Sequence, residues 1–246
     1  MTTDYNQISQ EYKKAKEHEW RARLEAYSMM KLIGPLAGRK VIDIACGEGH
    51  FTRKLRQAGA GETVGIDLSS QMIDLAQAQE AKTPLGITYR VEDACADGPP
   101  EDFDLAAAAW LLVYAQTRPA LEVMCRGIAR RLKPGGRFVT VMNNPDIVSF
   151  RHRDYRKYGC SLRMAHPVSD GTPIIWTIHL EDSSFDIENY YLPLAAYESA
   201  LRQAGFRDIK AHAMELAPRP DGIDDRGFWE DWLAEPPAIL LDCVKD

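Results

Sequence analysis

Two carboxylates and a pair of glycines occur at a spacing that suits nucleotide binding. Asp43, Gly47 and Gly49 lie within and just after an apolar run over residues 41–46. Asp67 ends a second apolar run, eighteen residues after Gly49. Glycine lets the backbone turn tightly and approach a ligand where a Cβ would clash, and a carboxylate can accept hydrogen bonds from both hydroxyls of a ribose. The pattern predicts a strand, glycine turn, helix and second strand that bind a nucleotide.

The residues beside the glycines indicate which nucleotide the chain would bind. A dinucleotide fold expects Gly or Ala five residues after the first glycine, where its helix begins against a pyrophosphate, but this chain has Thr52. The carboxylate of Asp43 would repel a pyrophosphate and attract a cation. S-adenosylmethionine joins an adenosine ribose to a cationic amino-acid tail, so it is the cofactor that we expect.

Further landmarks follow in a fixed order. A short strand at 89–91 precedes Asp93 and Ala94, residues 102–109 form a run with several alanines, and 132–142 combine a helix end, a Pro-Gly-Gly turn and a strand. This order resembles motif I and the following motifs of the class I S-adenosylmethionine-dependent methyltransferases. The resemblance implies that Asp93 binds the adenine amino group and that the next backbone N–H meets the ring.

The same resemblance implies the remaining cofactor contacts. Met72 would flank the adenine, although an apolar residue there also suits a core-facing helix start. An N-terminal helical segment commonly closes over the cofactor in this family, or its aromatic residues simply attach the helices to the core. The expected cofactor-binding residues are Asp43, Ala45, Gly47, Gly49, Asp67, Leu68, Met72, Asp93, Ala94, Ala109 and Tyr12.

The fold class follows from the alternation of strands and helices. We expect an α/β, doubly wound, mostly parallel seven-stranded Rossmann-like sheet in a single domain over 1–246. Its parts are an N-terminal helical lid (1–38), a cofactor-binding half (39–142), an insertion that forms the acceptor pocket (143–192) and a closing helix with strands (193–246). Helices are predicted at 51–58, 70–81 with Ser69 or Ser70 as N-cap, 119–132 and 195–204. A hairpin is predicted from strands at 173–180 and 184–192, and a terminal strand at 238–244.

Composition restricts the partners. The 246 residues are 45% hydrophobic and include no apolar run near the ~18–20 residues of a membrane span, and the N-terminus lacks a signal pattern. We therefore expect a cytoplasmic protein that does not contact a membrane.

Five cysteines without C-x-x-C spacing indicate reduced thiols rather than a metal site. The net charge of −6 opposes nucleic-acid binding, although the basic cluster at 151–157 could form a local cationic face. A monomer and a homodimer both remain open.

Four strings narrow the resemblance. They are Ala108–Ala115, Asn143–Asp146, Tyr155–Gly159 and Gly227–Trp229, the last followed by Pro236 and Pro237. In these strings the chain is similar to the bacterial small-molecule methyltransferases of toxoflavin biosynthesis, which N-methylate an azapteridine. The chain departs from these relatives at Val113, where we expect them to carry Asn, so one polar contact is lost.

The resemblance implies methyl transfer to a small acceptor. The methylated atom is expected to be a nitrogen, or less readily an oxygen, of a planar heteroaromatic compound or another natural product. In-line placement and desolvation can supply most of the acceleration. The residues expected at the acceptor are Tyr5, Trp110, Asn143 and Trp176.

A general base is needed only if the acceptor arrives protonated. The candidates are Tyr114, Asp146 and His179. Strand alternation places His179 and Trp176 on opposite faces, and we expect Trp176 to point inward. Two other functions stay open, namely a nucleotide-dependent oxidoreductase and a cofactor-binding partner protein without activity.

Overall fold

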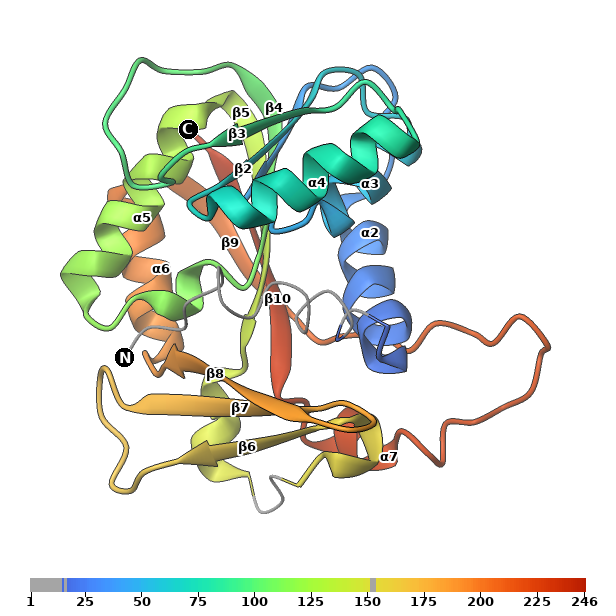
Figure 1. The fold of residues 1–246 in the computed structure, drawn as a ribbon. Coiled ribbons are helices and arrows are strands. Elements are labelled where there is room, and N and C mark those ends of the chain that lie inside the picture. Colours follow the sequence, from blue (N-terminus) through green and yellow to red (C-terminus); the bar gives the residue numbers. More distant parts are fainter. Residues whose placement is uncertain (1–14, 16, 151–153) are drawn as a thin grey trace.

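A seven-stranded sheet forms the centre of the computed structural model, which describes residues 15, 17–150 and 154–246 (Figure 1). The strands lie in the order β3-β2-β1-β4-β5-β10-β9. All neighbours are parallel except β10, which runs antiparallel to both β5 and β9. The strands are β1 (Val41–Ile44), β2 (Thr63–Asp67), β3 (Thr88–Val91), β4 (Phe103–Ala109), β5 (Leu132–Asn143), β9 (Phe206–His212) and β10 (Ala238–Lys245). The predicted fold class is confirmed.

The central strands are apolar because both of their faces are covered. All four residues of β1 are buried, and so are the alanines 106–108 of β4. Figure 1 shows α2 and α3 on one side of the sheet and α5 and α6 on the other. The chain order reverses between β1 and β4, and in such sheets ligands bind beyond the carboxyl ends of the strands at this point.

Two of the α-helices begin at a side-chain cap. Ser69 precedes α4 (Ser70–Lys82), and its Oγ accepts a hydrogen bond from the Met72 amide at 3.2 Å. Thr117 caps α5 (Arg118–Arg131) in the same way. Together with α3 (His50–Gln57) and α6 (Leu194–Gln203), these helices lie within about one residue of the predicted ranges.

The N-terminal segment is helical over residues 19–33. A π-helix, η1 (Arg21–Ala26), continues into α2 (Tyr27–Ile33), which ends at Gly34. π-Helical turns are rare and are often found at functional sites. Tyr5 and Tyr12 lie outside the described residues.

A second, three-stranded antiparallel sheet lies beyond the end of the main sheet (Figure 1). The predicted hairpin is present as β7 (Pro173–His179) and β8 (Ser184–Tyr190). The sequence did not reveal β6 (Cys160–Met164), which pairs with β7. The short helices η2 (Leu112–Tyr114), η3 (Pro145–Ser149), η4 (Arg156–Tyr158) and α7 (Glu230–Ala234) complete the fold.

The predicted turn before the fifth strand is instead part of β5. This strand begins at Leu132, opposite Phe103, and its regular pairing with β4 resumes only at Arg137, opposite Leu105. The Pro-Gly-Gly segment is therefore a bulge inside the strand rather than a turn before it. No helix in the described part of the chain is long and apolar enough to cross a bilayer.

Candidate active site

A cavity of about 360 Å³ lies at the carboxyl ends of β1, β2 and β4. Eight of the eleven residues that we expected to bind the cofactor line it, namely Ala45, Gly47, Asp67, Leu68, Met72, Asp93, Ala94 and Ala109. The other three are Asp43, Gly49 and Tyr12. Residues that are distant in sequence meet here because parallel strands bring their carboxyl ends to one edge of the sheet.

The glycine turn leaves this cavity open. Gly47 has φ +56°, and a Cβ built on it meets no atom within 4 Å. Ala45 also adopts a left-handed conformation, with φ +59°, which is uncommon for a residue with a side chain and is concentrated at functional sites. Gly49 does not line the cavity. A Cβ there would overlap the hydroxyl of Tyr89, so this glycine allows close packing of the neighbouring ring.

Asp67 joins the end of β2 to the glycine turn. One carboxylate oxygen, Oδ2, accepts a hydrogen bond from the Gly47 amide at 2.8 Å, and Oδ1 accepts one from the Ser69 amide at 2.9 Å. Burial raises the pKa of Asp67 above its ordinary value. A carboxylate offers about four lone-pair sites, so these two bonds leave capacity to accept the hydroxyl protons of a ribose.

Asp43 lies beneath the turn rather than in the large cavity. Its Oδ2 accepts a hydrogen bond from the Thr52 hydroxyl at 2.6 Å, and the carboxylate is buried. Asp43 lines a smaller space of about 20 Å³ that shares Ala45, Gly47 and Ala109 with the large cavity. Thr52 at the third glycine position therefore serves to bind this carboxylate.

The loop that carries Asp93 is held by α5. Arg131, fully buried in α5, donates from Nη1 to Glu92 at 2.6 Å and from Nη2 to the Asp93 carbonyl at 3.3 Å. A Cβ on Gly127 of α5 would overlap the Ala94 carbonyl oxygen, so only glycine lets the helix approach this closely. Sequence reasoning missed both residues, although a glycine inside a predicted helix was an available signal.

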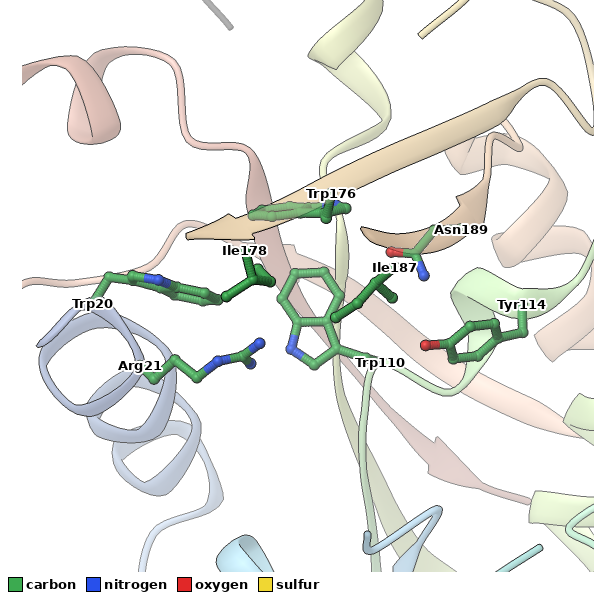
Figure 2. A pocket seen from close by; sticks show the side chains of 8 residues that line it. All are labelled: Trp20, Arg21, Trp110, Tyr114, Trp176, Ile178, Ile187 and Asn189. Carbon is green, nitrogen blue, oxygen red and sulfur yellow. The ribbon is translucent and has the colours of Figure 1, made fainter. Parts of the chain in front are cut away.

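A second, narrow cavity adjoins the first. Its volume is about 10 Å³, which is room for about one water molecule. Trp110 and Tyr114 line both cavities. The complete lining of the narrow cavity, shown in Figure 2, is Trp20, Arg21, Trp110, Tyr114, Trp176, Ile178, Ile187 and Asn189.

The π-helix η1 fixes the indole of Trp110 between the cavities. The Trp110 Nε1 donates to Glu25 Oε2 at 2.7 Å, and Arg21 Nη1 donates to the same oxygen at 3.0 Å. Trp110 itself has φ +69°, an outlier for a bulky residue. Sequence reasoning selected Trp110 but not Arg21 or Glu25.

Trp176 points inward, as we predicted. Its ring stacks with Trp20 at a centroid separation of 6.0 Å and meets Trp110 edge-on at 5.3 Å. The Trp176 Nε1 donates to Asn143 Oδ1 at 2.8 Å. Asn143 does not line either cavity, and its carbonyl group orients the tryptophan.

Of the three candidate bases, the structure places Tyr114 at the cavities. Asp146 is exposed at the start of η3 and lines neither cavity. His179 also lines neither, and its Nε2 lies 3.0 Å from the Ser161 hydroxyl. In the part of the chain that the structure describes, no group of three or more His, Cys, Asp or Glu residues could hold a metal ion.

Known proteins are similar to this chain in both sequence and fold. A methyltransferase domain model matches residues 41–136, which include the glycine turn, Asp67 and Asp93. The N-demethylindolmycin N-methyltransferase of Streptomyces griseus is 30% identical over 183 residues, which are 73% of each chain. A ubiquinone biosynthesis O-methyltransferase of Pseudomonas fluorescens is 30% identical over 148 residues, 54% of this chain and 62% of that protein.

A solved structure agrees on the fold. The putative S-adenosylmethionine-dependent methyltransferase of Listeria monocytogenes superposes with a TM-score of 0.60 and 20% identity, covering 95% of this chain and 98% of its own. The glycine turn, the carboxylate after β2 and these relatives lead to one assignment. The chain belongs to the class I S-adenosylmethionine-dependent methyltransferases.

Proposed function

We propose that the protein transfers the methyl group of S-adenosylmethionine to a nitrogen of a small, planar acceptor. The observation that carries this proposal is the pair of cavities that share Trp110 and Tyr114. One is large enough for a small-molecule ligand and carries the carboxylate of Asp67. The other is narrow and lined by indole rings, so the ring of a flat acceptor would lie beside Trp110 and Tyr114, where the two cavities meet.

The residues of the large cavity fit the cofactor. Asp67 would bind the ribose, and Asp93 with the Ala94 amide would bind the adenine, whose faces Leu68 and Met72 would cover. The open space at Gly47 and the buried carboxylate of Asp43 suit the amino-acid end with its cationic groups. When bound, S-adenosylmethionine supplies an electrophilic methyl group on a sulfonium.

The chain's own residues position the acceptor and exclude water. The rings of Trp20 and Trp110 both pack against Trp176 beside the cofactor cavity, so an acceptor bound next to them would be shielded from solvent. Tyr114 is the described candidate base that reaches both cavities. The second sheet and the N-terminal helical segment together form the cover of the acceptor pocket in this proposal.

The choice of nitrogen rests on a relative. The Streptomyces griseus protein is named as an N-methyltransferase, and the toxoflavin-type strings support the same atom. The ubiquinone relatives are named as O-methyltransferases, so methyl transfer to oxygen is the second candidate.

Product release tests the proposal. Purified protein is incubated with methyl-labelled S-adenosylmethionine and a panel of planar nitrogen heterocycles and phenols, and both S-adenosylhomocysteine and labelled product are measured. We expect acceptor-dependent release with the label on nitrogen. Label on oxygen would favour the second candidate, and cofactor binding without release for any acceptor would favour a partner protein without activity.

A further inference from the structure

We propose that the narrow cavity is a subsite for one oxygen atom of the acceptor, and that Asn189 determines specificity by donating a hydrogen bond to it. The acceptor would then be a planar ring that carries a carbonyl group, with the oxygen in the narrow cavity and the ring beside Trp110 and Tyr114. This inference rests on the proposed function, because it describes the acceptor of the same site.

Asn189 is the observation that points to a ligand. It lies on β8, it is 2% exposed, and its side chain lines the narrow cavity. Its Nδ2 is buried and has no hydrogen-bond partner among the residues that the structure describes. Leaving a buried donor unpaired is costly, and such groups call for an explanation. A ligand atom that accepts this hydrogen bond provides one.

Arg21 supplies a second polar group on the opposite side of the cavity. Figure 2 shows the guanidinium on one side of Trp110, and Asn189 with Tyr114 on the other. Arg21 is 3% exposed, and the ion pair with Glu25 and the ring of Trp20, 4.3 Å from the guanidinium carbon, hold it in place. A guanidinium and an amide N–H are both donors, so together they favour an oxygen that accepts.

The size and walls of the cavity fit a single oxygen. The volume of about 10 Å³ matches one water-sized group, and the remaining lining is apolar apart from Tyr114. Because Trp110 and Tyr114 line both this space and the large cavity, an oxygen placed here would leave the attached ring beside these two residues, where the cavities meet.

The test uses pairs of probes in which one member carries a ring carbonyl and a ring N–H, and the other carries neither but has an unprotonated ring nitrogen. The pairs are 2-pyridone with pyridine, 4-quinolone with quinoline, and acridone with acridine. Each is titrated into the protein with saturating S-adenosylhomocysteine, and the fluorescence of the lining tryptophans reports binding. We expect the wild type to bind at least one carbonyl compound about tenfold more tightly than its partner.

Two variants and a control separate recognition from folding. Asn189→Leu should abolish the preference while raising or preserving the melting temperature, because it removes a buried unpaired donor. Asn189→Asp should weaken binding of the carbonyl compounds further, because an acceptor replaces the donor. Ser184→Ala, at the exposed start of the same strand, should behave as wild type.

Three results would overturn the inference: a preference that survives in Asn189→Leu, equal binding within every pair by the wild type, or no binding of any carbonyl compound. Failure of the wild type to bind S-adenosylhomocysteine would instead count against the proposed function, and the probe titrations can still be run without it.

Discussion

At the scale of single residues, Asp67 is the carboxylate that we propose binds the ribose of the cofactor. Its two hydrogen bonds to backbone amides fix its orientation, whereas burial makes its ionised form less favourable than in the unfolded chain. A raised folded-state pKa means that this group stabilises the fold most below pH 3.8, its ordinary value, and that this contribution is lost as the pH rises through the raised pKa. Hydrogen bonds from ligand hydroxyls to the Asp67 carboxylate would offset the cost of burying its charge.

The pH dependence of cofactor binding tests the role of Asp67. We expect the affinity for S-adenosylhomocysteine to be constant near neutral pH and to fall as the pH is lowered through the raised pKa of this carboxyl, because protonation removes the charge that accepts hydroxyl protons. Calorimetry at a series of pH values measures this. Asp67→Asn should bind about tenfold or more weakly at pH 7 and should lose this pH dependence. An identical profile in both proteins would show that Asp67 does not contact the ligand.

The residues that follow strand ends could be predicted from the sequence, but the residues that contact them from distant parts of the chain could not. Gly47, Asp67 and Asp93 occupy fixed places after apolar runs, so local pattern was sufficient. Arg131 and Glu25 act through partners 39 and 85 residues away, and no local pattern reports such pairings. For Asn189, burial and the lack of a partner for Nδ2 become visible only when β8 is packed.

At the scale of elements, α5 supports the loop that carries Asp93. Gly127→Ala would place a methyl group against the Ala94 carbonyl oxygen. We expect this variant to lose about 1–3 kcal/mol of unfolding free energy and to bind S-adenosylhomocysteine more weakly, because the loop must move. Chemical denaturation and calorimetry check the two effects. Gly227→Ala is the matched control, since a Cβ there meets no atom within 4 Å. If Gly127→Ala binds S-adenosylhomocysteine as tightly as the wild type, the contact between α5 and the Ala94 carbonyl does not affect cofactor binding.

The second sheet places Trp176 at the narrow cavity, whose lining does not include the glycine turn. Trp176→Phe keeps a ring but removes the hydrogen bond to Asn143, and Trp176→Ala removes the ring as well. Once an acceptor is known, we expect both variants to raise its KM, Ala more than Phe, with cofactor affinity within about threefold of wild type because Trp176 does not line the large cavity. Steady-state kinetics and calorimetry measure these two quantities. Equal loss of both would indicate that Trp176 contributes only to the core.

Elements were predictable to the extent that their signals are local. Ser69, one of the two predicted N-caps, marks the start of α4, and the alternation along β7 indicates its buried face. The strand β6 is defined by its pairing, in which Cys160 lies opposite Ile178, and this register does not follow from its own five residues. The bulge in β5 escaped prediction for the same reason, because Pro-Gly-Gly is typical of a turn as well as of a bulge.

At the scale of the whole molecule, the main sheet and the second sheet contribute to neighbouring cavities. β1, β2 and β4 end at the large cavity, whereas η1, β7 and β8 supply the narrow one. Trp110 and Tyr114, which follow β4, belong to both.

Calorimetric titration of S-adenosylhomocysteine tests the central claim, that the cavity beside Gly47 binds the cofactor. We predict that the wild type binds it and that Gly47→Val does not, because the added side chain enters the open space of the cavity. Gly38→Val is the control, since Gly38 has a similar left-handed backbone, φ +72°, and also meets no atom within 4 Å of a built Cβ. It should bind as wild type does, because Gly38 does not line the cavity. Equal affinities of the wild type and Gly47→Val, or no binding by the wild type, would contradict the claim.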